Sequence, residues 1–448
     1  MASPCGFQVT GTVPTGLERC AAEECSEILG RSVTAQRGSI TCTLESAEEL
    51  AKFDQLRSVD NYRAVVGSLS NFCKGESTVL ERLKTLPFDG LLDWTAALSL
   101  WQFHRDNLDH VDTSGCRSDQ AGVNGSKELS GDKDESTSNG AGSDRQREIA
   151  PSHNQAVEGV EDTVERAASA GQGKRLYSSL LQNEGITFRV TCTRGGRKHG
   201  FSSPEAARSF GAGLADFFDW KVQLKNPDIE VLLAISGDEA KVGVALNRES
   251  KFKRNIAHFG PTTLRATIGY GMLRCAEIQP GDVVLDPLCG GGSISIEGSL
   301  AWPETHHIAG DIHHLAVQRA AANIESLLQE MNHGKEINHV KVDVCQWDVC
   351  QLPLRTSTVD VVVTDLPFGK KSGSRLANWS LYPKALGELA RVCRPQTGRA
   401  VLLTHDNKAF SRALQRNGFW KRVKTLWLNV GGLQTALYIL NRSSMLFH

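Results

Sequence analysis

The feature that most restricts the fold is a short apolar run at residues 359–369, VDVVVTDLPFG. The stretch from Val359 to Thr364 is rich in β-branched residues and too short for a typical helix. It therefore predicts a strand that is buried on both faces of a parallel sheet. The strand ends at Asp365, and a carboxylate in such a place costs free energy unless it has a use. The run predicts an α/β fold with chemistry at a strand end.

Three similar runs precede this strand, and each leads into an aspartate. These runs are DVVLD at 282–286, HHIAGD at 306–311 and HVKVDVCQWD at 339–348. A fifth strand is predicted at 399–406 and a final antiparallel pair at 424–431 and 434–442. Together they predict a doubly wound, Rossmann-like, seven-stranded domain over residues 257–448. We expect the strand at 339–345 to lie at an edge, where a partner can add a strand.

The N-terminal half predicts two α+β segments separated by an insertion. Residues 1–104 contain strand, helix and strand patterns of ferredoxin-like type. Residues 105–180 are rich in Gly, Ser, Asp and Glu and predict a disordered insertion, because they offer too little apolar surface to bury. Residues 181–256 predict a strand, a helix opened by Ser202-Ser203-Pro204 and a hairpin.

Charge is balanced over the whole chain, but the stretch 187–275, which overlaps the second of these segments, has an excess of basic residues. The chain has 50 basic and 51 acidic residues, whereas 187–275 has 14 Lys or Arg against 8 Asp or Glu. Such a surface would suit RNA phosphates, although an ordinary solvated face explains it equally well. The candidate phosphate contacts are Arg194, Arg197, Lys198, Lys251, Lys253 and Arg254, with Lys370 and Lys371 beside the target site.

Several classes of protein are disfavoured by the sequence. The 12 cysteines form no C-x-x-C pair, which argues against a metal site and for reduced thiols. No basic and apolar leader and no run of about 18 apolar residues is present, so we expect no membrane association. The expected location is the cytoplasm, with the nucleus as a second location.

A glycine-rich turn follows the strand that ends at Asp286. The segment DVVLDPLCGGG leads into a helix predicted from Ser293 to Trp302, and a cofactor can lie against such a turn. Asp311, 25 positions beyond Asp286, can accept hydrogen bonds from ribose hydroxyls. A nicotinamide cofactor and plain turn glycines are both open alternatives. Acids at three successive strand ends, with Asp286 near an amino-acid group and Asp348 near adenine, favour S-adenosylmethionine.

The stretch Asp365-Leu366-Pro367-Phe368 suits methylation of an exocyclic amine on a nucleobase. Such an amine is a poor nucleophile, because its lone pair is delocalised into the ring. The Asp365 carboxylate and the Leu366 carbonyl could accept its hydrogens, Pro367 would fix that carbonyl, and Phe368 could stack on the base. A tight turn with a capping aspartate is the structural alternative.

Longer motifs resemble one known family, the S-adenosylmethionine-dependent methyltransferases that carry an N-terminal THUMP RNA-binding module. The motifs are HFGPTTLRATIGYGMLR, DPLCGGGSISIEG, CQWDVCQLPLR, TDLPFGKKSGSRLANWSLYP and NVGGLQTALYIL, with VPTGLE, LRSVDN and FSSPEAARSFG in the N-terminal half. The resemblance implies a tRNA guanine-N2 methyltransferase that acts on the acceptor stem. It implies a THUMP module that begins within 1–104 and has its RNA-binding domain at 181–256, where it grips the 3′ end. It also implies a heterodimer with a small zinc-binding activator subunit.

The resemblance assigns roles residue by residue. The segment Phe259–Leu264 resembles a lid over the methionine end of the cofactor. The implied cofactor contacts are Phe259, Thr263, Leu264, Asp286, Pro287, Cys289, Gly290, Gly292, Asp311, Asp348 and Asp365. A core-packing interdomain helix is the alternative for Phe259, Pro261 and Leu264. One departure is Gly291, where relatives often place Thr or Ser, which implies a lower cofactor affinity if that hydroxyl contacts the cofactor.

Other classes of function stay open from the residues alone. A nicotinamide oxidoreductase explains the glycine turn but not DLPFG. A non-catalytic RNA-binding scaffold explains the basic segment, and a DNA or protein methyltransferase leaves the THUMP-like half idle. The amines of adenine N6, cytosine N4 and guanine N2 all present hydrogens to the same acceptors, so guanine N2 rests on the resemblance.

Overall fold

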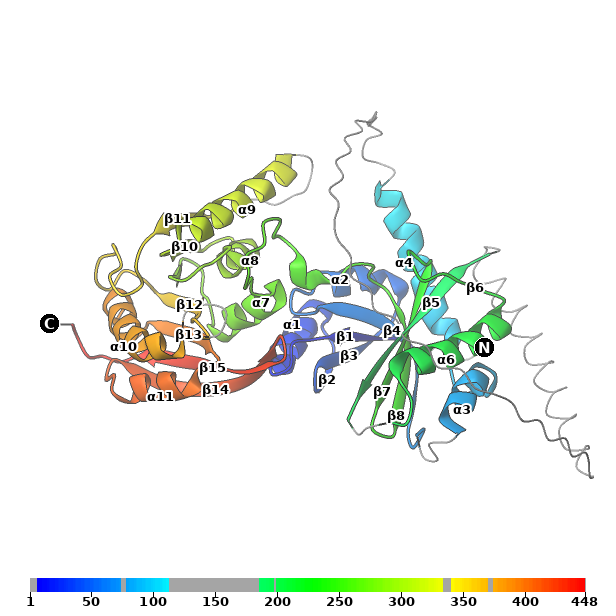
Figure 1. Cartoon of the computed structure of the whole chain (residues 1–448). Coiled ribbons are helices and arrows are strands. Elements are labelled where there is room, and N and C mark those ends of the chain that lie inside the picture. Colours follow the sequence, from blue (N-terminus) through cyan, green and yellow to red (C-terminus); the bar gives the residue numbers. More distant parts are fainter. Residues whose placement is uncertain are drawn as a thin grey trace, which may run out of the picture.

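The computed structural model describes residues 6–73, 78–112, 185–196, 199–332, 340–369 and 374–447. Most of the predicted insertion, and the candidate phosphate contacts Arg197, Lys198, Lys370 and Lys371, lie outside these residues. The described chain forms an eight-stranded and a seven-stranded sheet, each with helices packed against it (Figure 1). The predicted α/β architecture, with an α+β module before a doubly wound domain, is confirmed.

The C-terminal sheet has the strand order β11-β10-β9-β12-β13-β15-β14. Its first five strands are parallel, and β15 runs antiparallel to both of its neighbours. The strands are β9 (Val283–Asp286), β10 (His306–Asp311), β11 (Val342–Gln346), β12 (Val361–Asp365), β13 (Arg399–Thr404), β14 (Trp420–Val430) and β15 (Leu433–Arg442). The predicted edge position of the 339–345 strand is confirmed, because β11 has only one neighbour.

Helices cover both faces of this sheet, which explains why its central strands are apolar throughout. Val361 and Val363 join the core on the side of α7 and α8, whereas Val362 packs on the side of α10 and α11. The helices are α7 (Ala266–Cys275), α8 (Ser293–Ala301), α9 (His314–Asn332), α10 (Arg375–Val392) and α11 (Asn407–Gln415).

The N-terminal sheet has the order β2-β3-β1-β4-β8-β7-β5-β6. Its strands are β1 (Phe7–Thr12), β2 (Thr34–Gln36), β3 (Ser39–Leu44), β4 (Asn61–Leu69), β5 (Thr187–Gly195), β6 (Lys221–Val222), β7 (Ile229–Ser236) and β8 (Glu239–Ala245). Strand β4 pairs antiparallel with β8, so the segments before and after the insertion share one sheet. The division of residues 1–104 from 181–256 is therefore not a division between two sheets.

The N-terminal half contains several helices, and the one predicted after Ser202-Ser203-Pro204 is among them. The helices are α1 (Glu18–Leu29), α2 (Leu50–Asp54), α3 (Val79–Thr85), α4 (Trp94–Asp112) and α6 (Ser203–Phe218), with 3₁₀ turns at Ala47–Glu49, Leu86–Phe88 and Lys251–Lys253. The Ser202 hydroxyl accepts from the Glu205 amide, and the Glu205 carboxylate accepts from the Ser202 amide, which caps α6.

A buried polar junction joins the two halves. The Glu297 carboxylate on α8 is 1% exposed and receives Arg254 at 2.8 Å, Asn255 at 2.7 Å and Arg57 at 3.3 Å. Arg254 also donates to the Arg57 carbonyl at 2.7 Å. A continuous apolar core passes beside this junction, with Leu17 packed so close to Gly271 that a Cβ there would lie 2.6 Å from it. The halves therefore form one packed body.

The junction corrects one prediction from the charge pattern. Arg254, a candidate phosphate contact, is held in a buried ion pair and faces the protein interior. Lys251 likewise donates to Asp54, at 2.9 Å from its carboxylate, and is not a free surface cation. The ten cysteines within the described ranges are free thiols. No helix in the described part of the chain has the length and apolar character needed to span a bilayer.

Candidate active site

The aspartates predicted from the strand runs meet at one edge of the C-terminal sheet. Asp286, Asp311 and Asp365 are the last residues of β9, β10 and β12, which are neighbouring parallel strands. Ligands of open α/β sheets bind outside the carboxyl ends of the strands, where the strand order reverses. That reversal lies between β9 and β12, so the three acids border the expected binding site.

The glycine-rich turn after β9 is fastened to the acid at the end of β10. The Asp311 carboxylate accepts from the amides of Gly290 at 3.2 Å and His313 at 3.0 Å. Gly290 and Gly292 have φ values of 55° and 82°, which favour glycine over other residues. A Cβ at Gly290 would meet no atom within 4 Å, so the turn borders open space. This space can admit a nucleoside close to the backbone.

The electrostatics of the site favour a cation. Burial raises the pKa of Asp286 to about 8, with a smaller contribution from Asp365, although the Thr364 hydroxyl donates to Asp286 at 2.7 Å. Burial also raises the pKa of Asp365 to about 7, and Asp311 adds to that rise. No Lys or Arg among the described residues forms an ion pair with these three acids. A sulfonium cofactor, which carries positive charge, fits this arrangement.

The lid segment is fastened to the glycine turn by a residue that the sequence analysis missed. Asn323 on α9 is fully buried, and its amide oxygen accepts from the backbone of Ala257 at 3.0 Å and His258 at 2.7 Å. Its amide nitrogen donates to the carbonyls of His258 and Gly291 at 3.1 and 2.9 Å. No helix was predicted around Asn323, so the sequence analysis had no basis for giving this residue a role.

The lid itself is a loop, so the alternative of a core-packing helix for Phe259–Leu264 is wrong. Phe259 is 51% exposed, whereas Leu264 is buried. The Thr263 hydroxyl accepts from the Gly260 amide at 2.7 Å. An exposed aromatic ring on a tethered loop is available to cover a ligand in the neighbouring turn.

The target-base stretch is also held from a neighbouring helix. The Pro367 carbonyl accepts from the Tyr382 hydroxyl at 2.7 Å and from the Asn378 amide at 3.1 Å, and both residues on α10 are fully buried. Tyr382 also bonds the Thr404 hydroxyl at 2.9 Å. The sequence analysis assigned neither residue a role, although Tyr382 precedes Pro383 inside a helical pattern, which is an unusual place for proline.

The remaining predicted site residues differ in how far they are exposed. Asp348 is exposed in the turn after β11 and accepts from the Cys350 amide at 2.9 Å. Cys289 and Pro287 are buried in the turn after β9. Phe368 is half-buried, with its ring centroid 6.2 Å from that of His405. Their contacts with a cofactor or base stay predictions.

Two of the candidate phosphate contacts stay near the protein surface. Arg194 donates to the Ser203 hydroxyl at 3.1 Å and to the Phe201 carbonyl, so its orientation is fixed by the start of α6. Lys253 is exposed beside the Phe252 ring. Both can reach a ligand from solvent.

Two domain families match this chain. Residues 254–436 match the RMKL-like methyltransferase domain, and residues 172–245 match the THUMP domain. The first match contains every element of the candidate site, and the second contains β5 to β8 of the N-terminal sheet. The prediction of an S-adenosylmethionine-dependent methyltransferase is confirmed.

Comparison with individual proteins agrees with the domain matches. The chain is 43% identical to the tRNA (guanine(6)-N(2))-methyltransferase THUMP3 of Bos taurus, over 98% of this chain and 90% of that protein. It is also 43% identical to the protein of that description from Homo sapiens, over 98% and 89% of the two chains. The crystal structure of TrmN from Thermus thermophilus shares the fold with a TM-score of 0.63 at 19% identity, covering 97% of this chain and 99% of that one. The chain therefore belongs to the THUMP3 family of tRNA guanine-N2 methyltransferases.

Proposed function

We propose that this protein forms N2-methylguanosine in the acceptor stem of tRNA, around position six, as the catalytic subunit of a heterodimer. The general activity, guanine-N2 methylation of tRNA, follows from the family. The observation that carries the proposal for the chemistry is the position of Asp365-Leu366-Pro367-Phe368. This stretch follows β12 directly beside the glycine turn that follows β9, and buried side chains of α10 fix its backbone.

Each group of the target-base stretch has a defined task. S-adenosylmethionine supplies an electrophilic methyl group on a sulfonium when it is bound. The Asp365 carboxylate and the Leu366 carbonyl accept the two hydrogens of the guanine amine, which returns electron density to its nitrogen. Phe368 stacks on the purine, and Tyr382 and Asn378 fix the peptide that follows Leu366. Positioning of the amine then supplies much of the rate.

A duplex acceptor stem hides guanine N2 in the minor groove, so the target nucleotide has to leave the stack. Extruding a base costs a few kcal/mol, which stacking on Phe368 can offset. Acceptor-stem recognition is supported by the names of the THUMP3 relatives, which specify guanine at position six, and by the THUMP match.

Substitution of Asp365 tests the chemistry. We expect Asp365→Ala to abolish methylation of tRNA and to leave tRNA affinity nearly unchanged. The matched control is Glu304→Ala, which removes an exposed acid just before the start of β10, at the other end of the sheet, and should keep full activity. Parallel loss of binding and methylation in the Asp365 variant would contradict the assigned role.

The target nucleotide requires a separate measurement. Nucleoside mass spectrometry of RNA from cells that lack the protein should show loss of N2-methylguanosine from tRNA fragments that contain position six. Loss from another structured RNA, or loss of a different methylated base, would favour the alternative substrates. The cytoplasmic location stays a prediction.

The activator subunit of the heterodimer is proposed to dock on the open edge of β11. Two hydrogen bonds join the ends of β11 to β10. The His307 amide donates to the Lys341 carbonyl, and the Trp347 amide donates to the Asp311 carbonyl. In a parallel strand this pattern directs the main-chain groups of the even-numbered residues 342, 344 and 346 away from β10. Exposed Ile312 and Leu315 lie just after the neighbouring β10, and Val342 and Val344 are half-buried. A strand of the activator could add to this edge.

A proline at the edge tests this docking mode. Val344→Pro removes a main-chain amide that points away from β10 and leaves the hydrogen bonds between β10 and β11 intact, so the chain should stay folded. We expect the activator to be lost from co-purified complexes. The control is Val423→Pro at the opposite edge of the sheet, where Val423 has no partner residue in the β14–β15 ladder. Undiminished capture of the activator by the Val344 variant rules out this edge.

A further inference from the structure

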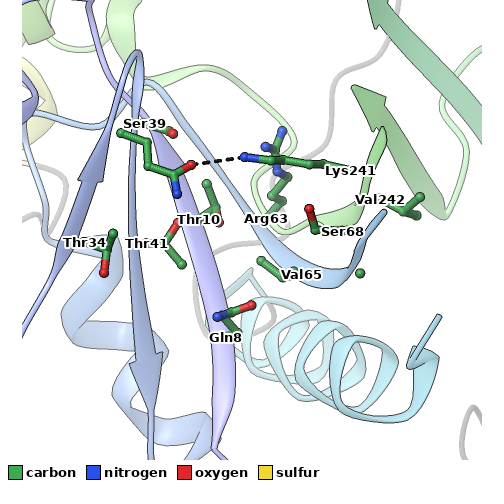
Figure 2. Close-up of a pocket in the computed structure, with 12 residues that line it drawn as sticks. Gln8, Thr10, Thr34, Ser39, Thr41, Arg63, Val65, Ser68, Lys241 and Val242 are labelled. Atoms are coloured by element: carbon green, nitrogen blue, oxygen red, sulfur yellow. Dashed lines mark hydrogen bonds between the residues drawn. The ribbon is translucent and has the colours of Figure 1, made fainter. Parts of the chain in front are cut away.

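The N-terminal sheet carries a polar hollow that the active site does not use (Figure 2). The hollow has a volume of about 260 Å³ and is lined by side chains from β1, β2, β3, β4 and β8. Val9 and Ala64 are paired in the β1–β4 ladder and face the core, whereas the next pair, Thr10 and Arg63, lines the hollow. The hollow therefore lies on the face of the sheet opposite the apolar core.

Both charged side chains that line the hollow are positive. Arg63 and Lys241 line it, and no Asp or Glu is among its lining residues. Lys241 donates to the side-chain oxygen of Gln36 at 3.1 Å, the bond drawn in Figure 2. Arg63 is half-buried, and burial lowers its pKa. Among the described residues nothing forms an ion pair or hydrogen bond with its guanidinium.

Two nearby arginines have acidic partners, which distinguishes Arg63 from them. Arg189, on the same face, pairs with Glu230 at 2.9 Å. Arg31, beside the adjoining hollow, pairs with Glu45 at 2.7 Å and with Glu49 at 2.8 Å. A half-buried cation without a partner costs free energy, so its retention points to an anion that binds there.

The sheet also leaves room for Arg63. A Cβ at Gly243 on β8 would lie 2.8 Å from the Arg63 side chain and 2.8 Å from the Ala64 carbonyl. A larger residue at 243 would therefore displace the arginine stem or the strand. The glycine therefore leaves space for the Arg63 stem beside β8.

The uncharged lining narrows the class of anion. Hydroxyls of Thr10, Thr41 and Ser68 and the amide of Gln8 surround the two cations, and no aromatic ring lines the hollow. Stacking of a base therefore has no platform here, whereas a phosphate and a ribose hydroxyl find both charges and hydrogen-bond donors. Lys241 lies on β8 within the THUMP match, while Arg63 lies on β4 before it. We propose that this hollow binds a phosphodiester of the RNA substrate, away from the methylated nucleotide.

This proposal rests on RNA being the substrate but not on which guanosine is methylated. Its test is tRNA affinity of the full-length protein at several salt concentrations. We expect Arg63→Gln to weaken binding about tenfold and to reduce the slope of log affinity against log salt by about one. Lys421→Gln, which removes an exposed cation on β14, is the charge-matched control and should change neither quantity.

Thermal unfolding separates binding from folding. Arg63→Gln removes an unneutralised half-buried charge, so its midpoint should equal or exceed that of the wild type, and inorganic phosphate should raise the wild-type midpoint more than that of the variant. A lower midpoint with a parallel loss of tRNA affinity would show a structural arginine and overturn the proposal. Unchanged tRNA affinity would overturn it too, even with phosphate protection, because the ligand would then be a small anion. The position of methylation, read by nucleoside mass spectrometry, is independent of these outcomes.

Discussion

At the residue scale, the active site is defined by acids whose pKa values are far from the ordinary range. Asp286 and Asp365 lie at the ends of adjacent strands without a basic partner among the described side chains, and burial raises both pKa values. The free site therefore holds protons near neutral pH. A cationic ligand favours the carboxylates, so ligand binding and proton release are coupled.

This coupling predicts a pH dependence of cofactor binding. The pKa of Asp365 is about 7 and that of Asp286 about 8, so we expect S-adenosylmethionine affinity to rise as pH increases from 6 to about 8.5. Because both folded-state pKa values exceed the unfolded ones, these acids stabilise the free protein most at acidic pH, and that contribution is lost as pH rises through about 8.

Calorimetric titration at several pH values checks this prediction, with thermal stabilisation by the cofactor as a second readout. The stabilisation by the cofactor should grow over the same range of pH. Asp365→Asn should remove the step near pH 7. A pH-independent affinity would show that the two acids do not meet the cationic part of the cofactor.

At the element scale, helix α10 fixes the loop that we propose holds the target base. Its Tyr382 and Asn378 side chains both donate to the Pro367 carbonyl. They do not touch the expected position of the base and act through the backbone, so they are positioning residues. The helix contributes geometry that the DLPF motif alone does not fix.

Removing one hydroxyl tests this role of α10. Tyr382→Phe should lower kcat about five- to tenfold, because one hydrogen bond to the Pro367 carbonyl is lost, while the KM for the cofactor stays nearly constant. The matched control is Tyr438→Phe, which removes a hydroxyl bonded to Ser411 at 2.9 Å in the same domain. Tyr438→Phe should lose about 1 kcal/mol of unfolding free energy, and Tyr382→Phe should lose more, because its hydroxyl also bonds Thr404; only Tyr382→Phe should lose turnover. Equal kcat values in the two variants would exclude a positioning role.

At the scale of the whole molecule, the RNA-binding half and the catalytic half are one packed body. The buried Glu297 carboxylate gathers side chains from both sides of the junction, and Thr267 on α7 donates to Asp60 at 2.7 Å. The N-terminal sheet therefore has a fixed orientation relative to the active site. A substrate held by the first half is presented at a set distance from Asp365.

The junction predicts that Arg254 contributes to stability and not to RNA contact. Arg254→Gln leaves Glu297 buried with a weaker partner, so we expect a loss of about 3 kcal/mol in unfolding free energy. The tRNA affinity of the folded protein should stay within twofold of the wild type. Lys253→Gln, at the exposed neighbouring position, is the control and should leave stability unchanged. Weakened tRNA binding with full stability in the Arg254 variant would restore the original assignment.

The sequence by itself determined the parallel strands of the C-terminal sheet and the aspartates at their ends. Apolar β-branched runs can only be buried between helices, and parallel strands bring their carboxyl ends to one edge, so Asp286, Asp311 and Asp365 had to converge. The cap of α6 and the hairpin of β7 and β8 followed equally from local patterns. These features depend on near neighbours in the chain.

Only the tertiary structure decided which cations are free and which side chains support the site. Arg63, Arg189 and Arg254 look alike in a charge count, yet Arg63 lacks a partner, Arg189 pairs with the half-buried Glu230, and Arg254 pairs with the buried Glu297. Asn323 and Tyr382 act on loops more than ten residues away along the chain. Their partners are set by the packing of distant elements, and packing between distant elements leaves no periodic signal in the sequence.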